Sequence, residues 1–330
     1  MSFIIPSESD LTNVLRELPG KLNCVKQLGD TKKQKVYLCV DSNGKQVVIK
    51  CTNPLAGEIY KTVQSLSITS IFKVSSIIEY RDKTWVVMPY ATGGDLGSLL
   101  TNIYLKKTCI DERTACRIAR SLVVGLMEIH NGGVLHRDIK PENIYLVFDD
   151  SEGCWRFLYA DLDGSSIRTS IKKLRDENHI GTLEFIRVTW DLLTWTTDND
   201  IFALALVLFW LFTGFPVHHQ TKGLGSNFLS KVEEEGLKCN KLFKFVEERR
   251  LGKKVQDDGG DIQGGVPFFR TPSLSIQNLL LNMLSPGYFD LSYAYNILEQ
   301  EILKAEVPFL ELLLELFCKS ISTICVEYLF

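Results

Sequence analysis

The amino-acid sequence predicts an α+β protein with two parts, a small N-terminal part rich in β-strands and a larger part that is mainly helical. Two observations support this prediction. Up to Tyr90 the chain contains β-prone runs separated by short turns, and beyond Gly93-Gly94 its apolar residues recur at helical spacing. The two adjacent glycines mark a break between packed segments. With 330 residues, the chain is long enough for two lobes.

Strands and one helix account for the N-terminal part. The sequence Asn43-Gly44, which lies between two β-prone runs, is typical of a tight hairpin. Residues 55–66 follow Pro54, a residue favoured at the start of a helix, so we expect a helix there. Four strands are expected, at 35–40, 45–50, 71–80 and 84–88.

Helices dominate the C-terminal part. Residues 199–212 are apolar on all sides, which is typical of a central buried helix. The glycine-rich, charged stretch at 251–265 predicts an exposed loop, and the leucines that follow Phe309 predict a terminal helix. A further helix with one buried stripe is expected from Ile118, Leu122, Val123, Leu126 and Ile129.

Composition excludes several classes of protein. Hydrophobic residues at 45% and charged residues at 23% are ordinary values for a globular protein. A net charge of −3 gives no electrostatic basis for binding nucleic acid or a membrane, so neither is expected as a partner. The longest apolar run, 201–215, is too short to cross a bilayer. Nine scattered cysteines without a signal peptide predict buried thiols in a reducing compartment, cytoplasmic or alternatively nuclear.

The segment 136–143 carries the clearest chemical pattern in the chain. It places Asn143 five positions after Asp138, with Lys140 between them. This arrangement suits phosphoryl transfer, in which an enzyme mainly positions groups and neutralises charge. Asp138 can accept a hydroxyl proton, Lys140 can lie against the transferred phosphate, and Asn143 can hold a metal ion. The alternative interpretation is a polar loop between two buried segments.

This segment, His-Arg-Asp-Ile-Lys-Pro-Glu-Asn, resembles the catalytic loop of eukaryotic protein kinases at every defining position. The resemblance covers roughly residues 20–300. It implies a bilobal kinase domain that transfers the γ-phosphate of ATP to a serine or threonine of a protein substrate, since Lys140 and Thr182 match the serine/threonine type. The implied organisation is an N-terminal extension at 1–19, a kinase domain at 20–305 (N-lobe 20–88, hinge 89–92, C-lobe 93–305) and a C-terminal helix or tail at 306–330.

The resemblance also assigns a lysine and its partner. Lys50 ends a Val-Val-Ile-Lys strand and matches the family's lysine that contacts the α- and β-phosphates. Taken alone, Lys50 would be read as a surface lysine at the end of a strand. In the family a helix glutamate holds this lysine. Glu58 is the only acid between Cys51 and Ile78, so a Lys50–Glu58 ion pair is expected.

Further matches outline a nucleotide site. Met88 corresponds to the residue at the back of the adenine pocket, with the Pro89 carbonyl and the Ala91 N–H facing adenine. Asp95 would reach the ribose or, equally, cap a helix. Asp161 matches the metal-binding aspartate, and together with Asn143 it would hold Mg²⁺. The remaining ATP-binding positions implied by the resemblance are Gly29, Val36, Val48 and Tyr145.

Several positions depart from the family pattern. Only Gly29 remains of the glycine-rich phosphate loop, because Thr31 and Gln34 replace the later glycines. Asp163 stands where the family has the glycine that follows its metal-binding aspartate by two positions, and it adds a negative charge near the metal and the phosphates. Val48 and Tyr145 add bulk to both faces of the adenine slot, which predicts a narrowed pocket. These departures motivate an alternative, a pseudokinase that acts as a binding or scaffold module with weak or no use of ATP. A small-molecule kinase is a third, weaker alternative.

The stretch after Asp161 suggests regulation. Ser165, Ser166, Thr169 and Ser170 are candidate phosphorylation sites, where a phosphate could pair with Arg137. The alternative is a polar loop that is never phosphorylated. The resemblance further implies that Asp200 braces the catalytic loop, although an ordinary acid at the start of a helix would look the same. A regulatory protein partner is a further expectation.

Overall fold

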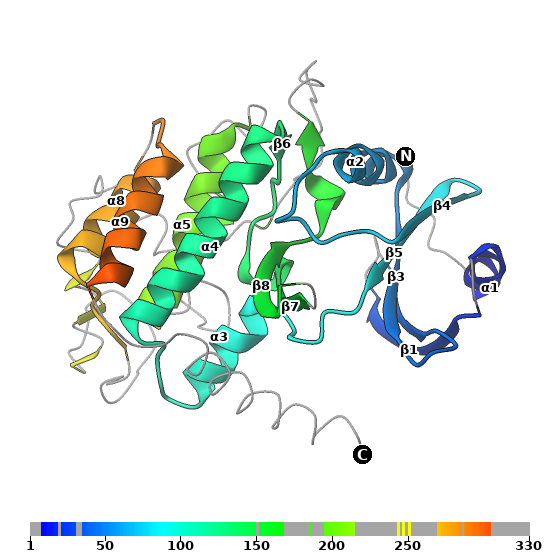
Figure 1. The fold of residues 1–330 in the computed structure, drawn as a ribbon, viewed down its shortest axis with the longest axis horizontal. Coiled ribbons are helices and arrows are strands. Elements are labelled where there is room, and N and C mark those ends of the chain that lie inside the picture. Colours follow the sequence, from blue (N-terminus) through cyan, green and yellow to red (C-terminus); the bar gives the residue numbers. More distant parts are fainter. Residues whose placement is uncertain are drawn as a thin grey trace, which may run out of the picture.

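The computed structural model describes residues 8–18, 21–30, 35–149, 152–167, 182, 185–186, 195–214, 243–244, 246–247, 250–251, 269–285 and 287–304. A β-rich N-terminal part and a helical C-terminal part lie next to each other (Figure 1). The predicted two-part α+β architecture is therefore confirmed.

The N-terminal part is built on an antiparallel five-stranded sheet in the order β1-β2-β3-β5-β4. At the β2–β3 hairpin, Asp41 accepts hydrogen bonds from the N–H groups of Asn43 and Lys45, and Gly44 adopts a positive φ of 80°. The strands are β1 (Asn23–Asp30), β2 (Lys35–Val40), β3 (Gln46–Thr52), β4 (Ser76–Tyr80) and β5 (Lys83–Pro89).

The expected set of strands needs two revisions. Sequence reasoning missed β1, and it extended the strand that ends at Tyr80 back to Ile71. Residues 70–72 pair with Tyr159 instead, through the Tyr159 N–H to the Ser70 carbonyl and the Phe72 N–H to the Tyr159 carbonyl. A β-prone run can satisfy its backbone groups against any nearby edge, and its composition does not reveal which one.

The N-terminal helix α1 (Glu8–Glu17) packs on the small sheet. Its Val14 side chain is fully buried in a cluster that also contains Ile49 and Trp85. Asp10 is buried as well and pairs with Lys83 at 3.3 Å and with Arg81 at 2.9 Å. Although the sequence suggested an extension at 1–19, its residues 8–18 contribute to the core of the N-terminal part.

One pair of cysteines differs from the expectation of free thiols. Cys24 and Cys39 are register partners on β1 and β2, and a disulfide joins them. The antiparallel register brings their Cα atoms to 4.0 Å, a proximity that spacing along the chain does not reveal. The other described cysteines (Cys51, Cys109, Cys116 and Cys154) are free thiols.

Helix α2 (Pro54–Ser65) lies between the five-stranded sheet and the C-terminal part (Figure 1). Asn53 caps it by accepting a hydrogen bond from the Ala56 N–H at 2.9 Å, and Pro54 occupies its first turn. The predicted helix at 55–66 is confirmed. Its buried face consists of Ala56, Gly57, Tyr60 and Val63, which recur at helical spacing.

Gly57 allows α2 to approach β5 closely, so we expect Gly57→Ala to destabilise the protein. Alanine in a helix normally stabilises by about 1 kcal/mol relative to glycine. Here the added Cβ would lie 2.4 Å from Thr84 Oγ1 and 2.7 Å from Thr84 Cγ2. We expect a loss of about 1 to 3 kcal/mol in the free energy of unfolding, measured by urea denaturation.

Leu55 on the same helix provides the control. Its side chain is exposed, so Leu55→Ala should stay within about 0.5 kcal/mol of wild type. A Gly57→Ala variant as stable as wild type would contradict the close packing.

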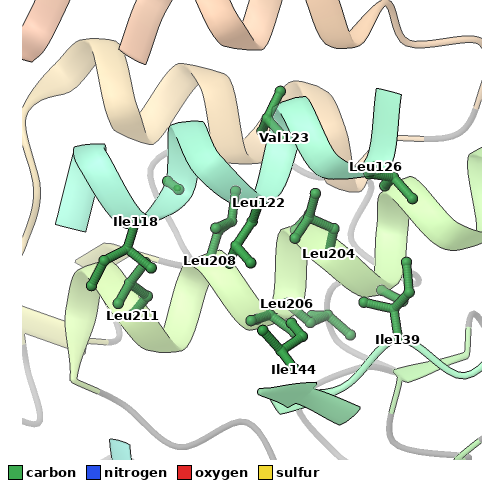
Figure 2. Close-up of a cluster of buried hydrophobic side chains, with 14 of the residues drawn as sticks. Ile118, Leu122, Val123, Leu126, Ile139, Ile144, Leu204, Leu206, Leu208 and Leu211 are labelled. Atoms are coloured by element: carbon green, nitrogen blue, oxygen red, sulfur yellow. The ribbon is translucent and has the colours of Figure 1, made fainter. Parts of the chain in front are cut away.

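The C-terminal part is organised around α4 and α5. The predicted stripe on α4 is buried: Ile118 and Leu122 point towards α5, and Val123 points to the opposite side of α4 (Figure 2). The side chains of α5 from Ile201 to Thr213 are all buried as well. Both expectations about these helices are confirmed. The described helices of this part are α3 (Leu96–Leu105), α4 (Glu112–Asn131), α5 (Thr197–Thr213), α8 (Leu274–Leu284) and α9 (Leu291–Leu303).

Two short two-stranded sheets position the loops between the two parts. The pair β6–β9 flanks the segment after Leu135, and the pair β7–β8 delivers the segment after Tyr159. The segments 136–143 and 160–165 are therefore brought together. The elements are β6 (Val134–Leu135), η1 (Pro141–Asn143), β7 (Ile144–Asp149), β8 (Cys154–Tyr159), η2 (Leu162–Gly164) and β9 (Ser166–Ile167).

Two expected segments cannot be compared with the structure. The loop at 251–265, apart from Leu251, and the helix from Phe309 lie outside the described residues. Within the described ranges, no helix combines the length and apolar character needed to cross a membrane.

Candidate active site

The buried carboxylate of Asp200 holds the start of the segment 136–143 in place. Asp200, in the first turn of α5, accepts hydrogen bonds from the N–H groups of His136 at 2.8 Å and Arg137 at 2.9 Å. His130 Nε2 and Trp195 Nε1 contact the same carboxylate at 3.0 and 3.2 Å. Burial raises the pKa of Asp200, but these neighbours, His130 foremost, outweigh burial and lower it below its ordinary value. The expected bracing of the loop by Asp200 is confirmed.

The backbone of this loop turns sharply. Arg137 has a φ of 68°, in the left-handed region that non-glycine residues seldom adopt. Its guanidinium lies over the Trp195 ring at 5.8 Å, and His136 Nε2 contacts the Ala160 carbonyl oxygen at 3.0 Å. These contacts and those of Asp200 fix an otherwise unfavourable turn, as is common where a backbone presents functional side chains.

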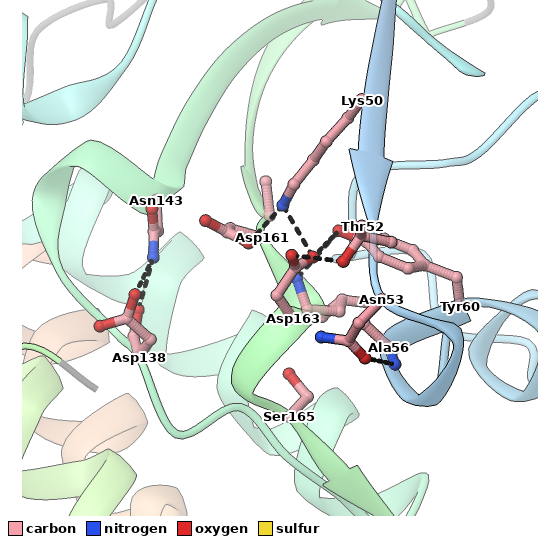
Figure 3. Close-up of polar contacts among 12 residues, drawn as sticks. Lys50, Thr52, Asn53, Ala56, Tyr60, Asp138, Asn143, Asp161, Asp163 and Ser165 are labelled. Atoms are coloured by element: carbon pink, nitrogen blue, oxygen red, sulfur yellow. Dashed lines mark hydrogen bonds and ion pairs between the residues drawn. The ribbon is translucent and has the colours of Figure 1, made fainter. Parts of the chain in front are cut away.

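The side chain of Asp138 lies at the centre of a polar cluster. Asn143 Nδ2 donates to Asp138 Oδ2 at 2.8 Å, a contact visible in Figure 3, and Lys140 Nζ lies 3.0 Å from the same oxygen. Thr182 Oγ1 donates to Asp138 Oδ1 at 2.7 Å and accepts a hydrogen bond from Lys140 Nζ at 2.8 Å. The structure therefore brings together Asp138, Lys140 and Asn143, as predicted.

Lys50 lies in a second polar cluster on the other side of the junction (Figure 3). Its Nζ contacts Asp161 Oδ1 at 2.6 Å and Asp163 Oδ1 at 2.7 Å. Burial acts to lower the pKa of Lys50, but Tyr60, Asp163 and Asp161 outweigh it and raise the pKa above its ordinary value. Because burial also raises the pKa of Tyr60, its phenol stays neutral, and the two carboxylates supply the charge.

Asp161 is ionised in this environment. Burial raises the pKa of its carboxyl, yet Lys50 more than offsets that effect, and His136 and Lys140 add to the lowering. Its backbone is also in the left-handed region, with a φ of 63°. The carboxylate is thus held as an anion beside the loop that carries Asn143.

The predicted Lys50–Glu58 pair is wrong. The Glu58 side chain is 65% exposed and pairs with Lys61 at 2.9 Å. The helical period explains this exposure. Ala56 and Tyr60 lie on the buried face, and Glu58 is two residues from each of them, which is a rotation of about 200° around the helix axis. Tyr60 therefore occupies the inward position.

Three residues of the Lys50 cluster were missed as site residues. Asp163 had been noted only as a departure from the family's glycine, while Thr52 and Tyr60 had no assignment. The periodicity of small and apolar residues at 56, 57, 60 and 63 was the signal that could have placed Tyr60 inward. No comparable signal existed for the contact between Thr52 and Asp163, which are 111 residues apart.

A pocket of about 370 Å³ opens beside both clusters, which is within the usual range for small-ligand sites. It contains every residue predicted to bind ATP except Glu58, together with the two predicted metal ligands. The predicted residues that line it are Gly29, Val36, Val48, Lys50, Met88, Pro89, Ala91, Asp95, Asn143, Tyr145 and Asp161.

The expected crowding of the slot does not close this pocket. The Tyr145 ring packs edge-on against Phe72, with centroids 5.8 Å apart, and both rings line the cavity. Burial, followed by Asp95 and Asp161, raises the pKa of the Tyr145 phenol. Asp95 caps α3 by accepting a hydrogen bond from the Ser98 N–H at 2.7 Å, and it also lines the pocket.

The donor set fits a hard cation shared with phosphate. Among the described residues, no three His, Cys, Asp or Glu side chains gather into a metal cage. Mg²⁺ is usually held by one or two carboxylates plus substrate phosphates, and Asp161 supplies a carboxylate. Asn143 uses its amide N–H group for Asp138 (2.8 Å to Oδ2), which leaves its carbonyl oxygen for a metal.

Two of the candidate phosphorylation sites are not presented to solvent. Ser165 and Ser166 are each 8% exposed, and Ser165 Oγ donates to the His136 carbonyl at 3.0 Å. Phosphorylation at either serine would require this packing to open, and it stays a prediction. Thr169 and Ser170 lie outside the described residues, as do Thr31 to Gln34 of the expected phosphate loop.

Comparison with known proteins agrees with this site. The protein kinase domain family matches residues 22–287, and the chain belongs to that family. Protein kinase domains as a class use ATP and a divalent metal ion and act on proteins.

Three serine/threonine-protein kinases illustrate the similarity. Kinase cds1 of Schizosaccharomyces pombe is 29% identical over 44% of this chain and 32% of its own length. MAP kinase-interacting kinase 1 of Xenopus laevis is 23% identical over 85% of this chain and 68% of its own length. PAK 1 of Mus musculus is 31% identical over 41% of this chain and 28% of its own length. The chain thus spans about a third of the length of cds1 and less of PAK 1.

Proposed function

We propose that this chain is a protein serine/threonine kinase that transfers the γ-phosphate of ATP, with Mg²⁺, to a hydroxyl of a protein substrate. One observation carries the proposal. A single pocket is lined by the predicted adenine-facing residues Pro89 and Ala91 and by the charged or metal-binding residues Lys50, Asn143 and Asp161. Asp138 adjoins this end of the pocket through Asn143.

In the proposed reaction, Asp138 orients the substrate hydroxyl and accepts its proton. The hydroxyl oxygen forms a bond to the γ-phosphorus, the bond between that phosphorus and the bridging oxygen breaks, and ADP leaves with the electron pair. Lys50 neutralises charge on the phosphates that stay with ADP, and Lys140 neutralises charge on the transferred group. When bound, Mg²⁺ would add further charge neutralisation at Asp161 and Asn143.

The contacts of Lys140 support a serine/threonine substrate. Lys140 Nζ lies within hydrogen-bond distance of both Asp138 and Thr182. Lys140, two positions after the catalytic acid Asp138, therefore lies beside the carboxylate that would accept the proton of the substrate hydroxyl. A regulatory protein partner remains a proposal. The absence of nucleic acid and membrane partners and a cytoplasmic or nuclear location are also proposals, and these rest on composition.

The direct test is nucleotide binding followed by phosphoryl transfer. With Mg-ATP at 100 times its Kd, we expect the protein to gain about 2.7 kcal/mol and its Tm to rise by about 5 °C. Chelation of the metal should reduce this shift, and wild type should label serine or threonine in casein. No shift at millimolar Mg-ATP together with no transfer would contradict the proposal and favour the pseudokinase alternative.

A matched pair of variants assigns the shift to this pocket. Val48→Phe adds bulk to the cavity wall and should abolish the shift, whereas Val25→Phe adds the same ring at an exposed position of β1 and should leave it intact. Equal shifts in both variants would place ATP elsewhere.

A further inference from the structure

We infer that Asp163 replaces the α2 glutamate that the family uses to position the phosphate-binding lysine, and that Tyr60 connects α2 to this carboxylate. The inference deepens the proposed kinase function and rests on it for the catalytic part. It assigns Asp163 and Tyr60 as positioning residues that act through Lys50.

The first argument concerns the charges around Lys50. Two carboxylates contact its Nζ, Asp161 at 2.6 Å and Asp163 at 2.7 Å. Asp161 is the predicted metal ligand, so its charge is shared with the cation during the reaction. Asp163 is then the carboxylate left to orient the ammonium.

The second argument is the way in which Asp163 is itself held. Its side chain is 14% exposed. Oδ2 accepts a hydrogen bond from Thr52 Oγ1 at 2.6 Å, and Oδ1 accepts one from Tyr60 OH at 3.2 Å (Figure 3). A carboxylate fixed from two sides presents its charge to Lys50 in one geometry, which reduces the entropy lost on pairing.

The third argument concerns α2. Tyr60 OH donates to Asp163 and accepts a hydrogen bond from the Leu162 N–H at 3.2 Å. This phenol therefore ties α2 to the segment 161–164 with both of its hydrogen-bonding functions. The connection that a glutamate would provide as an ion pair is provided here by a neutral side chain and a relocated acid.

The position of Glu58 excludes the usual arrangement in this conformation. Glu58 is the only acid in α2, and it pairs with Lys61 at 2.9 Å on the outer face. Bringing it to Lys50 would require the helix to rotate by about half a turn. The close approach of Gly57 to Thr84 on β5 opposes such a rotation.

The kinetic test compares Asp163→Gly, which restores the family's residue, with Glu58→Gln. We expect Asp163→Gly to lower kcat by about 10- to 100-fold, because a misplaced Lys50 loses phosphate contacts in the transition state. The KM for ATP should change less. Glu58→Gln should leave both parameters near wild type. If Glu58→Gln lowers kcat as much as Asp163→Gly does, the inference is overturned.

A rescue experiment separates positioning from a general structural effect. Tyr60→Glu in wild type adds a third carboxylate beside Asp161 and Asp163, and it should lower kcat. The same Tyr60→Glu change in the Asp163→Gly background supplies the missing acid from α2, and it should raise kcat at least several-fold over Asp163→Gly alone. A further loss of kcat in the double variant would count against the inference.

A measurement without nucleotide distinguishes failure of this inference from failure of the proposed function. Asp163→Ala and Tyr60→Phe should each lower Tm. The loss in the double variant should be smaller than the sum, because both changes remove the same hydrogen bond, from Tyr60 OH to Asp163 Oδ1. Amide hydrogen exchange in α2 should also accelerate in Tyr60→Phe. Additive losses of Tm would contradict the contact, even if wild type proves inactive towards protein substrates.

Discussion

Replacing Asp138 with asparagine is expected to lower kcat for phosphoryl transfer by about 10² to 10⁴-fold, the usual contribution of a positioned base. The amide has the same shape as the carboxylate, so the surrounding cluster should persist. Its oxygen can accept from Asn143, now 2.8 Å from Asp138 Oδ2, and its NH₂ group can donate to Thr182 Oγ1. What the amide cannot do is take up the proton of the substrate hydroxyl.

The measurement is single-turnover transfer to casein, with Mg-ATP affinity determined in parallel by calorimetry. Affinity should stay within a few-fold of wild type, because Asp138 is not among the residues that line the pocket. Asp82→Asn, at the exposed turn between β4 and β5, is the matched control and should transfer phosphate normally. Full activity in Asp138→Asn would indicate another base or a contaminating kinase.

The second large effect is expected at Asp200. Asp200→Asn preserves volume but turns an NH₂ group towards donors that now point at a carboxylate, including the backbone N–H groups of His136 and Arg137. Removing one partner of a buried charged network typically costs about 3 to 5 kcal/mol, and we expect a loss of that size in the free energy of unfolding. The catalytic loop loses its brace in the same step, so kcat should fall as well.

Chemical denaturation of wild type and Asp200→Asn measures this loss. Asp290→Asn is the control, because Asp290 caps α9 through the Ser292 N–H at 2.8 Å and asparagine caps equally well. A difference below about 1 kcal/mol between Asp200→Asn and wild type would contradict the bracing role.

The pH dependence of this difference has a defined sign. The pKa of Asp200 is lower in the folded protein than in the unfolded chain, where an aspartate titrates at about pH 4. Its stabilisation is therefore fully present above about pH 4 and is lost as the pH falls through the lower, folded value. The gap between wild type and Asp200→Asn should be constant from neutral to mildly acidic pH and should narrow only below about pH 4.

The sequence predicted most reliably those features that are local in the chain. Asp138, Lys140 and Asn143 lie within six positions, so their common loop largely fixes their proximity. The buried stripe of α4 and the buried helix α5 were predicted equally well, because the spacing of apolar residues along the chain indicates which helix faces are buried. The family resemblance then predicted the residues that line the pocket, and all predicted ATP-binding residues except Glu58 are found there.

Tertiary structure decided which acid serves Lys50. The sequence predicted Glu58, because it is the acid nearest to Lys50 in the chain. Glu58 lies two positions along α2 from residues of the buried face, so its side chain points away from Lys50. Asp163 reaches Lys50 across 113 residues, because β3 and the segment after β8 meet at the junction of the two parts. The disulfide between Cys24 and Cys39 and the burial of Ser165 likewise depend on contacts between segments that are separated in the chain. The fold family, the catalytic loop and the residues that line the pocket could be predicted from the sequence alone. Which groups pair within the site depends on packing between segments that are distant in the chain, and the order of residues does not reveal that packing.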